Sequence, residues 1–123
     1  MSSEALHAPR ERLTQQTLQL HHAIVSLMEE LDAIDWYRQR ADDTEDESLK
    51  ALLLHNMREE MEHAAMLVEW LRRADTDFAG FLKKYLFGKG SILAAERTAT
   101  PDDPADREGD RLGGLTIGSL RQE

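Results

Sequence analysis

Residues 45–73 read EDESLKALLLHNMREEMEHAAMLVEWLRR, and this stretch decides the fold. Ala, Leu, Glu and Arg are abundant in it and β-branched residues are scarce, so we expect one long helix. Steps of four and three residues select the face of this helix that a partner helix would cover. The residues on that face are Leu49, Leu53, Asn56, Glu60, His63, Leu67 and Trp70.

The middle of this face is polar, although both of its ends are apolar. Burying an unpaired carboxylate is costly, so Glu60 would have to lose its charge or meet a cation. Glu60 and His63 are three residues apart and therefore lie on one side of a helix. This spacing lets a carboxylate and an imidazole bind one metal ion. The alternative interpretation is a core histidine whose partner is Glu60.

A second amphipathic stretch precedes this helix and predicts a helix from about Arg12 to Arg40. Its stripe consists of Leu13, Thr17, Leu20, Ile24, Leu27, Leu31 and Ile34. The turn over residues 41–46 is short, so the two helices should be antiparallel neighbours. Thr44 followed by Glu47 predicts a capping box at the start of the second helix.

Glu30 is the carboxylate on the first helix that would lie level with Glu60 and His63. The residues that share its side of the helix are Ala23, Ser26, Ala33 and Tyr37. Small side chains around an acid leave room for an ion, and Tyr37 could donate its hydroxyl to a ligand. A lone glutamate is more often a solvated acid, so the prediction depends on all three residues lying at one level.

A single hairpin contains half of a four-helix metal site. Di-metal carboxylate bundles take one Glu from each of two helices and one Glu-x-x-His from each of the other two. Two antiparallel copies of this chain would complete that set, with a two-fold axis between the metals. A two-helix hairpin alone also buries too little surface to fold well. We therefore expect an all-α fold in which the antiparallel hairpin dimerises into a four-helix bundle. Its ligands suit iron or manganese and also bind zinc.

The composition restricts the classes of function. The chain has 123 residues, a net charge of −9 and no cysteine, which excludes disulfides, thiolate zinc sites and iron–sulfur clusters. The negative charge argues against nucleic acid as a partner. No apolar run approaches the roughly 20 residues that cross a bilayer, and the N-terminus has no secretory signal. We expect a cytoplasmic protein without a membrane partner.

The ends of the chain differ in character from the hairpin. The boundaries that we expect are 1–10 for a disordered N-terminus, 11–87 for the helical domain, 88–111 for a linker and 112–123 for a C-terminal peptide. A shorter helix should follow the hairpin over Phe78–Leu86, and Asp75, Thr76 and Asp77 are candidates for its N-cap. The linker is rich in Gly, Pro and Asp, with one short helix predicted over Ser91–Arg97.

At these residues the sequence resembles the encapsulated ferritins, which are ferritin-like cargo proteins of encapsulin shells. The resemblance runs almost continuously from Leu20 to Phe87. The segments that carry it are His22–Ser26, Met28–Leu31, Ile34–Tyr37, Glu60–Met66 and Tyr85–Phe87. It implies a ferroxidase with a di-iron centre between two subunits, holding two iron ions per dimer. It also implies a ring-shaped decamer that has no storage cage of its own.

The resemblance also assigns roles to single residues. Motif match gives the ligand role to Glu30, Glu60 and His63, and places Trp36 and Tyr37 beside the centre. Accessory positions follow in the same way.

Glu29 and Asp32 match acids that guide iron inwards, although the family pattern has a longer Glu where this chain has Asp32. His55, Glu59 and Glu62 match an outer metal site, and solvated surface is the alternative interpretation.

The segment LGGLTIGSLR at residues 112–121 resembles the targeting peptide that loads cargo into encapsulin shells. Leu115, Ile117 and Leu120 would lie extended in an apolar groove, where Gly118 permits close approach. The resemblance therefore implies an encapsulin shell as partner and the lumen of the nanocompartment as location. A tail without function is the alternative.

Three hypotheses about function remain open at this point. The first is a ferroxidase that oxidises ferrous iron with dioxygen and supplies iron for storage inside the shell. The second is a non-enzymatic, iron-binding adaptor cargo. The third is a structural helical dimer whose polar layer is satisfied without metal.

Overall fold

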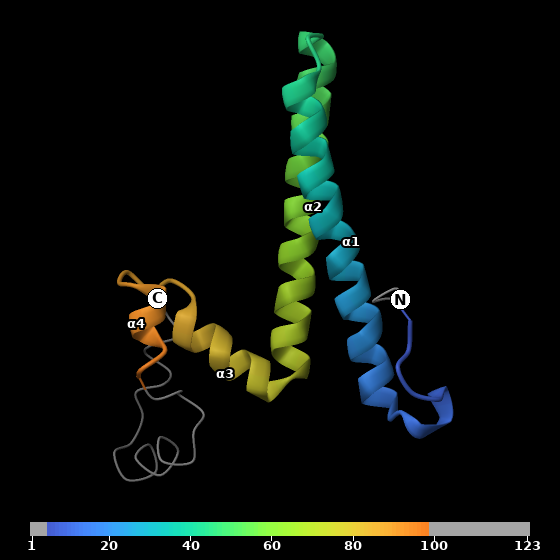
Figure 1. The fold of residues 1–123 in the computed structure, drawn as a ribbon, viewed down its shortest axis with the longest axis vertical. Coiled ribbons are helices and arrows are strands. Elements are labelled where there is room, and N and C mark those ends of the chain that lie inside the picture. The colour runs from blue at the N-terminus through green and yellow to red at the C-terminus, as the bar shows by residue number, and fades with distance from the viewer. Residues whose placement is uncertain (1–4, 99–123) are drawn as a thin grey trace. The chain divides into compact units, whose positions relative to one another are not determined.

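The computed structural model describes residues 5–98, and all of its regular elements in that range are helices (Figure 1). The all-α prediction is therefore confirmed. The elements are the 3-10 helix η1 (Arg10–Arg12), the long helices α1 (Gln15–Asp43) and α2 (Glu47–Ala74), and the shorter helices α3 (Thr76–Tyr85) and α4 (Ile92–Ala95). Among the described residues, none of these helices has the length and apolar character needed to cross a bilayer.

The chain divides into two compact units, with the boundary between Ala74 and Asp75. The first unit contains the hairpin and the second contains α3 and α4. The first part of the predicted linker, residues 88–98, is described, whereas residues 99–111 of it and the predicted C-terminal peptide lie outside the described residues. Residues 1–4 lie outside them as well.

In the first unit, α1 and α2 pack side by side as an antiparallel hairpin, as expected (Figure 1). α1 begins later than predicted, because Leu13 is extended and the Thr14 hydroxyl accepts from the Thr17 N–H at 3.1 Å. α1 also ends three residues later, at Asp43 instead of Arg40. Ala41 is only 1% exposed, so packing against α2 extends the helix through residues that resembled a turn.

The cap of α2 is Asp46, and the predicted capping box at Thr44 is wrong. An Asp46 carboxylate oxygen accepts from the Leu49 N–H at 3.0 Å, which is the bond that an N-cap residue makes. The Thr44 hydroxyl accepts from the Asp46 N–H at 3.2 Å, which braces the turn before the helix. Because α1 is longer than predicted, the cap lies two positions further along the chain, at Asp46 instead of Thr44.

Asp46→Ala is expected to lower the free energy of unfolding by about 1 kcal/mol, the usual value of an N-cap. Thr44→Ala is the matched control and should cost less, because its hydroxyl contacts no N–H of the helix. Guanidinium unfolding of both variants at one fixed protein concentration measures the difference. A larger loss for Thr44→Ala would contradict the assignment of the cap.

The residues buried between the two helices differ from the predicted stripes. α2 buries Met57, Ala64 and Leu71, each one position beyond Asn56, His63 and Trp70 of the predicted face. α1 buries Leu18, Ala23 and Ala41, and leaves Ile24 and Leu31 about half exposed. Both helices therefore have more apolar surface than the hairpin covers. The predicted stripes combine this intramolecular seam with a neighbouring face that remains open.

Polar contacts fix the open end of the hairpin, where α1 begins and α2 ends. The Gln16 side-chain amide donates to the Ala74 carbonyl at 3.0 Å. Glu69 accepts from Arg72 at 2.7 Å and from Arg73 at 2.6 Å. The hydrogen bonds from Arg72 and Arg73 lower the pKa of Glu69 to about 2. This network stabilises the last turn of α2, where positive charges also interact favourably with the helix dipole.

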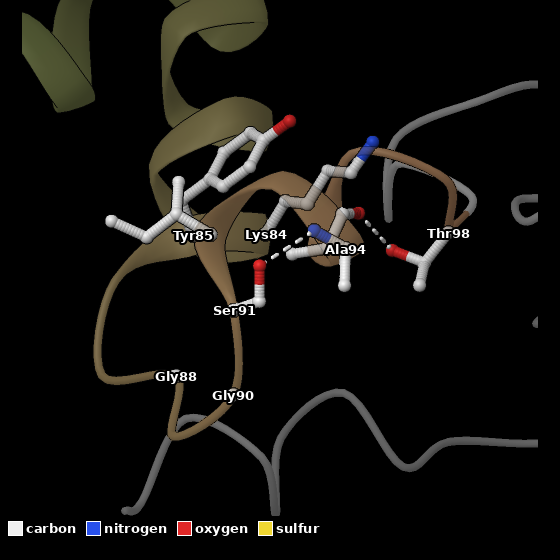
Figure 2. Close-up of a pocket in the computed structure, with 9 residues that line it drawn as sticks. Lys84, Tyr85, Gly88, Gly90, Ser91, Ala94 and Thr98 are labelled. Carbon is white, nitrogen blue, oxygen red and sulfur yellow. Dashed lines mark hydrogen bonds between the residues drawn. The ribbon is translucent and has the colours of Figure 1, made fainter.

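The second unit contains both of the short helices that were predicted. α3 begins at the Asp75 cap, whose carboxylate accepts from the Asp77 and Phe78 N–H groups. It runs from Thr76 to Tyr85, so it starts two residues and ends one residue before the predicted Phe78–Leu86. α4 is shorter than the predicted Ser91–Arg97, because Ser91 is its N-cap rather than its first residue and the helix ends at Ala95. The Ser91 hydroxyl accepts from the Ala94 N–H at 3.2 Å, a hydrogen bond drawn as a dashed line in Figure 2.

Candidate metal centre

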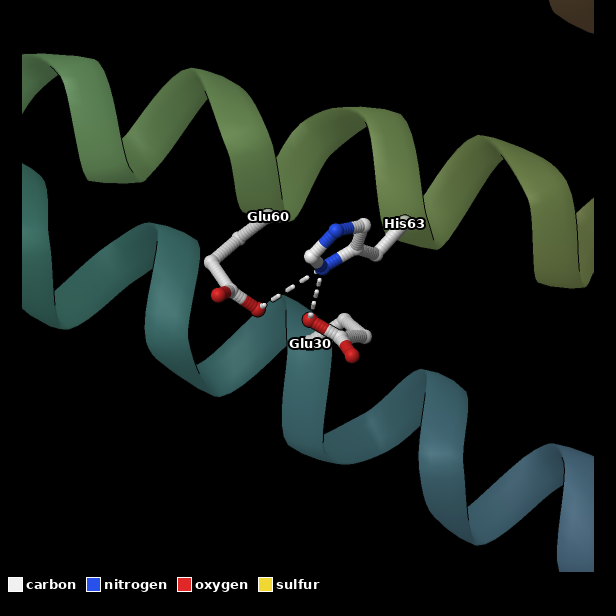
Figure 3. Close-up of side chains that lie close together, drawn as sticks. All are labelled: Glu30, Glu60 and His63. Carbon is white, nitrogen blue, oxygen red and sulfur yellow. Dashed lines mark ion pairs between the residues drawn. The ribbon is translucent and has the colours of Figure 1, made fainter.

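Three of the predicted site residues converge between the long helices (Figure 3). α1 carries Glu30, and α2 carries Glu60 and His63 on successive turns of one face. His63 Nδ1 lies 3.7 Å from Glu30 Oε2 and 3.8 Å from Glu60 Oε2. The imidazole therefore faces both carboxylates at once, one from its own helix and one from the opposite helix.

The spacing of these donor atoms fits a metal ion. In zinc sites, for example, bonds to carboxylate and imidazole ligands are about 2.0–2.2 Å long, so two ligands of one ion lie at most about 4.4 Å apart. The 3.7 and 3.8 Å separations fall within this limit. All three donor atoms lie within 4.8 Å of one another, so small side-chain movements would close them on an ion. Among residues 5–98, no other group of three metal-ligating side chains comes this close.

The second sign of a ligand site is a buried oxygen without a hydrogen bond. Glu30 Oε2 is buried and accepts no hydrogen bond from the described residues. Its neighbour His63 Nδ1, at 3.7 Å, is too distant to donate one. Buried polar atoms are nearly always satisfied, and an unsatisfied carboxylate oxygen is costly. A bound cation would provide the missing partner.

The centre is covered on one side only. The side chains of Glu30 and Glu60 are 23% and 24% exposed, whereas that of His63 is 46% exposed. His63 belongs to a row of residues spaced by seven along α2, in which Leu49 and Trp70 are 44% and 42% exposed. The apolar surface that Leu49 and Trp70 leave exposed at the two ends of this row is typical of a face that a further helix covers.

Trp36 and Tyr37 lie near the end of α1 and share one cationic partner. The Arg40 guanidinium lies 6.0 Å from the Trp36 ring and 5.8 Å from the Tyr37 ring. Within residues 5–98 the Tyr37 hydroxyl makes no hydrogen bond to the three converging residues, so its predicted role as a donor to a ligand stays a prediction. Sequence reasoning missed Arg40, although its spacing of three and four residues from the two rings indicates the contact.

The accessory acids do not join the centre. Glu29 and Asp32 are exposed on α1 and belong to no close group of metal-ligating side chains among the described residues. His55 Nε2 lies 3.4 Å from Glu59 Oε1, which places two of the three predicted outer residues in contact. Glu62 does not complete that pair as a third ligand in the described part of the chain. The accessory roles therefore stay predictions.

Comparison with known families tests the resemblance that the sequence suggested. A family model described as EncFtn-like matches residues 5–89. The chain belongs to the EncFtn-like family. The matched residues include the whole hairpin, the three converging side chains and α3, so family membership and the centre rest on the same part of the fold.

Two proteins with assigned names are similar to this chain in sequence. The Rhodospirillum rubrum protein named "Encapsulated ferritin-like protein" is 48% identical over 130 residues, covering 99% of this chain and 91% of the relative. The Myxococcus xanthus protein named "Encapsulin nanocompartment cargo protein EncC" is 38% identical over 102 residues, covering 76% of this chain and 77% of the relative.

A solved structure agrees with the fold. The crystal structure of a Nitrosomonas europaea protein has 49% sequence identity and a TM-score of 0.69, and the match covers 72% of this chain and 97% of that one. The helical fold of the matched part of the chain has therefore been observed experimentally in a protein of 49% sequence identity.

Proposed function

We propose that this protein is a ferroxidase, whose substrates are ferrous iron and dioxygen and whose product is ferric iron. The observation that carries the proposal is the convergence of Glu30 Oε2, Glu60 Oε2 and His63 Nδ1, with Glu30 Oε2 buried and unsatisfied. Carboxylate oxygens and one imidazole form a donor set that suits iron. Membership of the EncFtn-like family and the ferritin-like names of the relatives support the choice of iron among the metals that this donor set would bind.

The proposed centre is shared by two copies of the chain. One chain contributes two carboxylates and one imidazole, which is half the ligand set of a ferritin-like di-iron bundle. Two copies related by a two-fold axis would contribute four carboxylates and two imidazoles to two iron ions. Four carboxylates also balance the four positive charges of two ferrous ions, so the centre is neutral before oxidation. The exposed row through Leu49, His63 and Trp70 supports this pairing.

Each side chain has a defined task in this site. Glu30 and Glu60 hold the ions through hard oxygen donors and come from opposite helices of the hairpin, so a bound ion also links α1 to α2. His63 reaches the open side and fixes the position of the ion relative to the second copy. Paired ions can pass two electrons to dioxygen together, one from each ferrous ion.

The direct test is aerobic titration of the purified protein with ferrous sulfate while ferric absorbance is followed. The expected result is oxidation that saturates with iron and is much faster than autoxidation in buffer. A rate equal to that of buffer, combined with stoichiometric bound iron by metal analysis, would favour the non-enzymatic adaptor. Absence of bound iron would favour the structural dimer with a polar layer.

Removal of metal is expected to weaken assembly. If the ligands come from two copies, metal binding stabilises the associated state by mass action. A chelator should therefore shift the population towards smaller species and lower the midpoint of thermal unfolding. Native mass spectrometry with and without iron, at one protein concentration, measures the shift. Identical species in both samples would count against metal-driven assembly while leaving the ligand set intact.

Two further parts of the proposal concern assembly and location. The oligomer is a homodimer at minimum and a decamer if the resemblance to encapsulated ferritins extends to the ring. The C-terminal peptide, residues 112–123, directs the protein into the lumen of an encapsulin shell. The match to the Rhodospirillum rubrum relative supports this role, because an alignment over 99% of the chain includes that peptide. The domain boundaries given above follow the same division, with the hairpin performing oxidation and the peptide performing delivery.

A further inference from the structure

The segment of residues 83–93, at the end of α3 and the start of α4, combines exposed apolar side chains with lysines. The large apolar residues of this basic segment and their exposed fractions are Leu86 49%, Phe87 96%, Ile92 73% and Leu93 73%. Residues 78–95 contain three lysines and no acid, in a chain with a net charge of −9. Lys83 and Lys89 are exposed on the same stretch. An exposed apolar patch of this kind marks an interaction surface.

The backbone of Phe87 points to the same conclusion. Phe87 has a φ of 63°, which is the left-handed conformation. At the ends of helices this conformation is usually adopted by glycine. Among the described residues it is the only non-glycine residue with a positive φ. The next residue is Gly88, which would adopt this conformation without strain, and Figure 2 shows Gly88 and Gly90 in the loop that leads to Ser91. A strained aromatic residue held in solvent indicates a function for its side chain.

The hairpin has a turn of opposite charge. Residues 42–47, the acidic turn, contain five acids and no basic residue. All five acids are exposed. Leu52, on the second turn of α2, is 55% exposed beside this acidic turn and offers an apolar surface. The acidic turn therefore combines negative charge with an exposed leucine, which complements the lysines and Phe87 of the basic segment.

The proposed two-copy centre determines which parts of two chains come near each other. Glu30 lies near the middle of α1 (Gln15–Asp43) and Glu60 near the middle of α2 (Glu47–Ala74). A two-fold axis through the centre of an antiparallel pair therefore brings the acidic turn of one copy level with the end of α2 in the other. α3 starts at Thr76, two residues after that end.

We propose that the basic segment of one copy docks on the acidic turn of a second copy, with Lys83 and Lys89 facing the carboxylates and Phe87 packing beside them. The contact rests on the two-copy centre proposed above. It is a second contact between the copies, far from the metal ligands, and we call it the latch. Because it is largely electrostatic, it favours the correct antiparallel pairing and weakens with salt.

The test is a charge swap in the full-length, iron-loaded protein. Lys83→Glu with Lys89→Glu is expected to raise the dissociation constant of the assembly at least tenfold at low salt, measured by sedimentation over a dilution series. Asp42→Lys with Asp43→Lys should weaken assembly similarly. Combining all four substitutions should restore most of the affinity. Arg10→Glu with Arg58→Glu, two exposed residues outside both segments, is the control of equal charge change and should have little effect.

Phe87→Ser tests the apolar part and should weaken assembly without loss of helix, since the Phe87 side chain is 96% exposed among the described residues. Two results would contradict the proposed contact. The first is an unchanged dissociation constant in the lysine variant. The second is a combined variant in which the losses of affinity from the two charge variants simply add, with no restoration. Aerobic iron oxidation separates the proposed ferroxidase from the proposed contact between copies. It is assayed at protein concentrations above the raised dissociation constant, so that the variants are still assembled. Retained oxidation with weakened assembly supports the latch, whereas rescue of assembly in a protein that never oxidises iron would remove the ferroxidase and leave the latch standing.

Discussion

Glu60→Ala is expected to reduce the rate of aerobic ferrous oxidation by more than tenfold. In the proposed dimer each ligand residue occurs twice, so one substitution removes two of six ligands from the centre. Changes in residues that merely support a metal ligand typically cost about 10–100-fold, and loss of the ligand itself should cost at least as much. Glu30→Ala and His63→Ala should give losses of the same order, because both contribute donor atoms to the same cluster.

Glu62→Ala is the matched control, since Glu62 is an exposed acid on the same helix that does not join the cluster. Its oxidation rate should stay within about twofold of the unmodified protein, and it tests the predicted outer site as well. Circular dichroism of all four variants checks that the helices are retained. Near-normal turnover of Glu60→Ala with intact helix content would rule out the proposed centre.

Deletion of residues 112–123 is expected to abolish packaging into an encapsulin shell while leaving the oxidation rate of the free protein intact. The peptide carries Leu115, Ile117 and Leu120. Burying three such side chains in a groove would contribute about 1.5–3 kcal/mol each, before the cost of ordering the peptide. Loss of that contribution leaves no affinity for the shell, whereas the ligands on α1 and α2 remain in place.

The measurement for packaging is co-purification of the protein with tagged shell protein expressed in the same cells. Leu115→Asp with Ile117→Asp in the full-length chain is the companion variant, which keeps the length of the peptide but removes its apolar character. Equal loading of the full-length and truncated proteins would show that the peptide is not the targeting signal. A large loss of oxidation in the truncated protein would show that the domain boundary is misplaced.

The three converging residues could be predicted from sequence because the helices are long and their period is regular. A polar interruption at Glu60 and His63 in an otherwise apolar face stands out, and a short turn fixes which residue of the first helix lies level with them. Errors of up to three residues at the helix ends did not move Glu30 away from this level, because the interhelical packing sets the register. The cap of α3 could be placed within Asp75–Asp77 for a local reason, since the capping side chain bonds within its own turn.

Other features depend on packing that a single face does not reveal. The seam of Met57, Ala64 and Leu71 lies one position from the predicted stripe, because that stripe also includes a neighbouring apolar face that the hairpin leaves exposed. Asp46 replaces Thr44 as the cap because Ala41 is buried and α1 continues beyond Arg40. The positive φ of Phe87 could not be predicted, since glycine follows at the next position and was the natural candidate for that conformation.

The most direct test of a shared di-iron centre is a crystal structure of the iron-loaded protein with anomalous diffraction recorded at the iron edge. The expected result is two iron ions for every two chains, close to a two-fold axis. Glu30, Glu60 and His63 of both copies should contribute their ligands. Iron bound wholly within one chain, or anomalous peaks only at the exposed acids of residues such as Glu59 and Glu62, would contradict a centre formed between two copies.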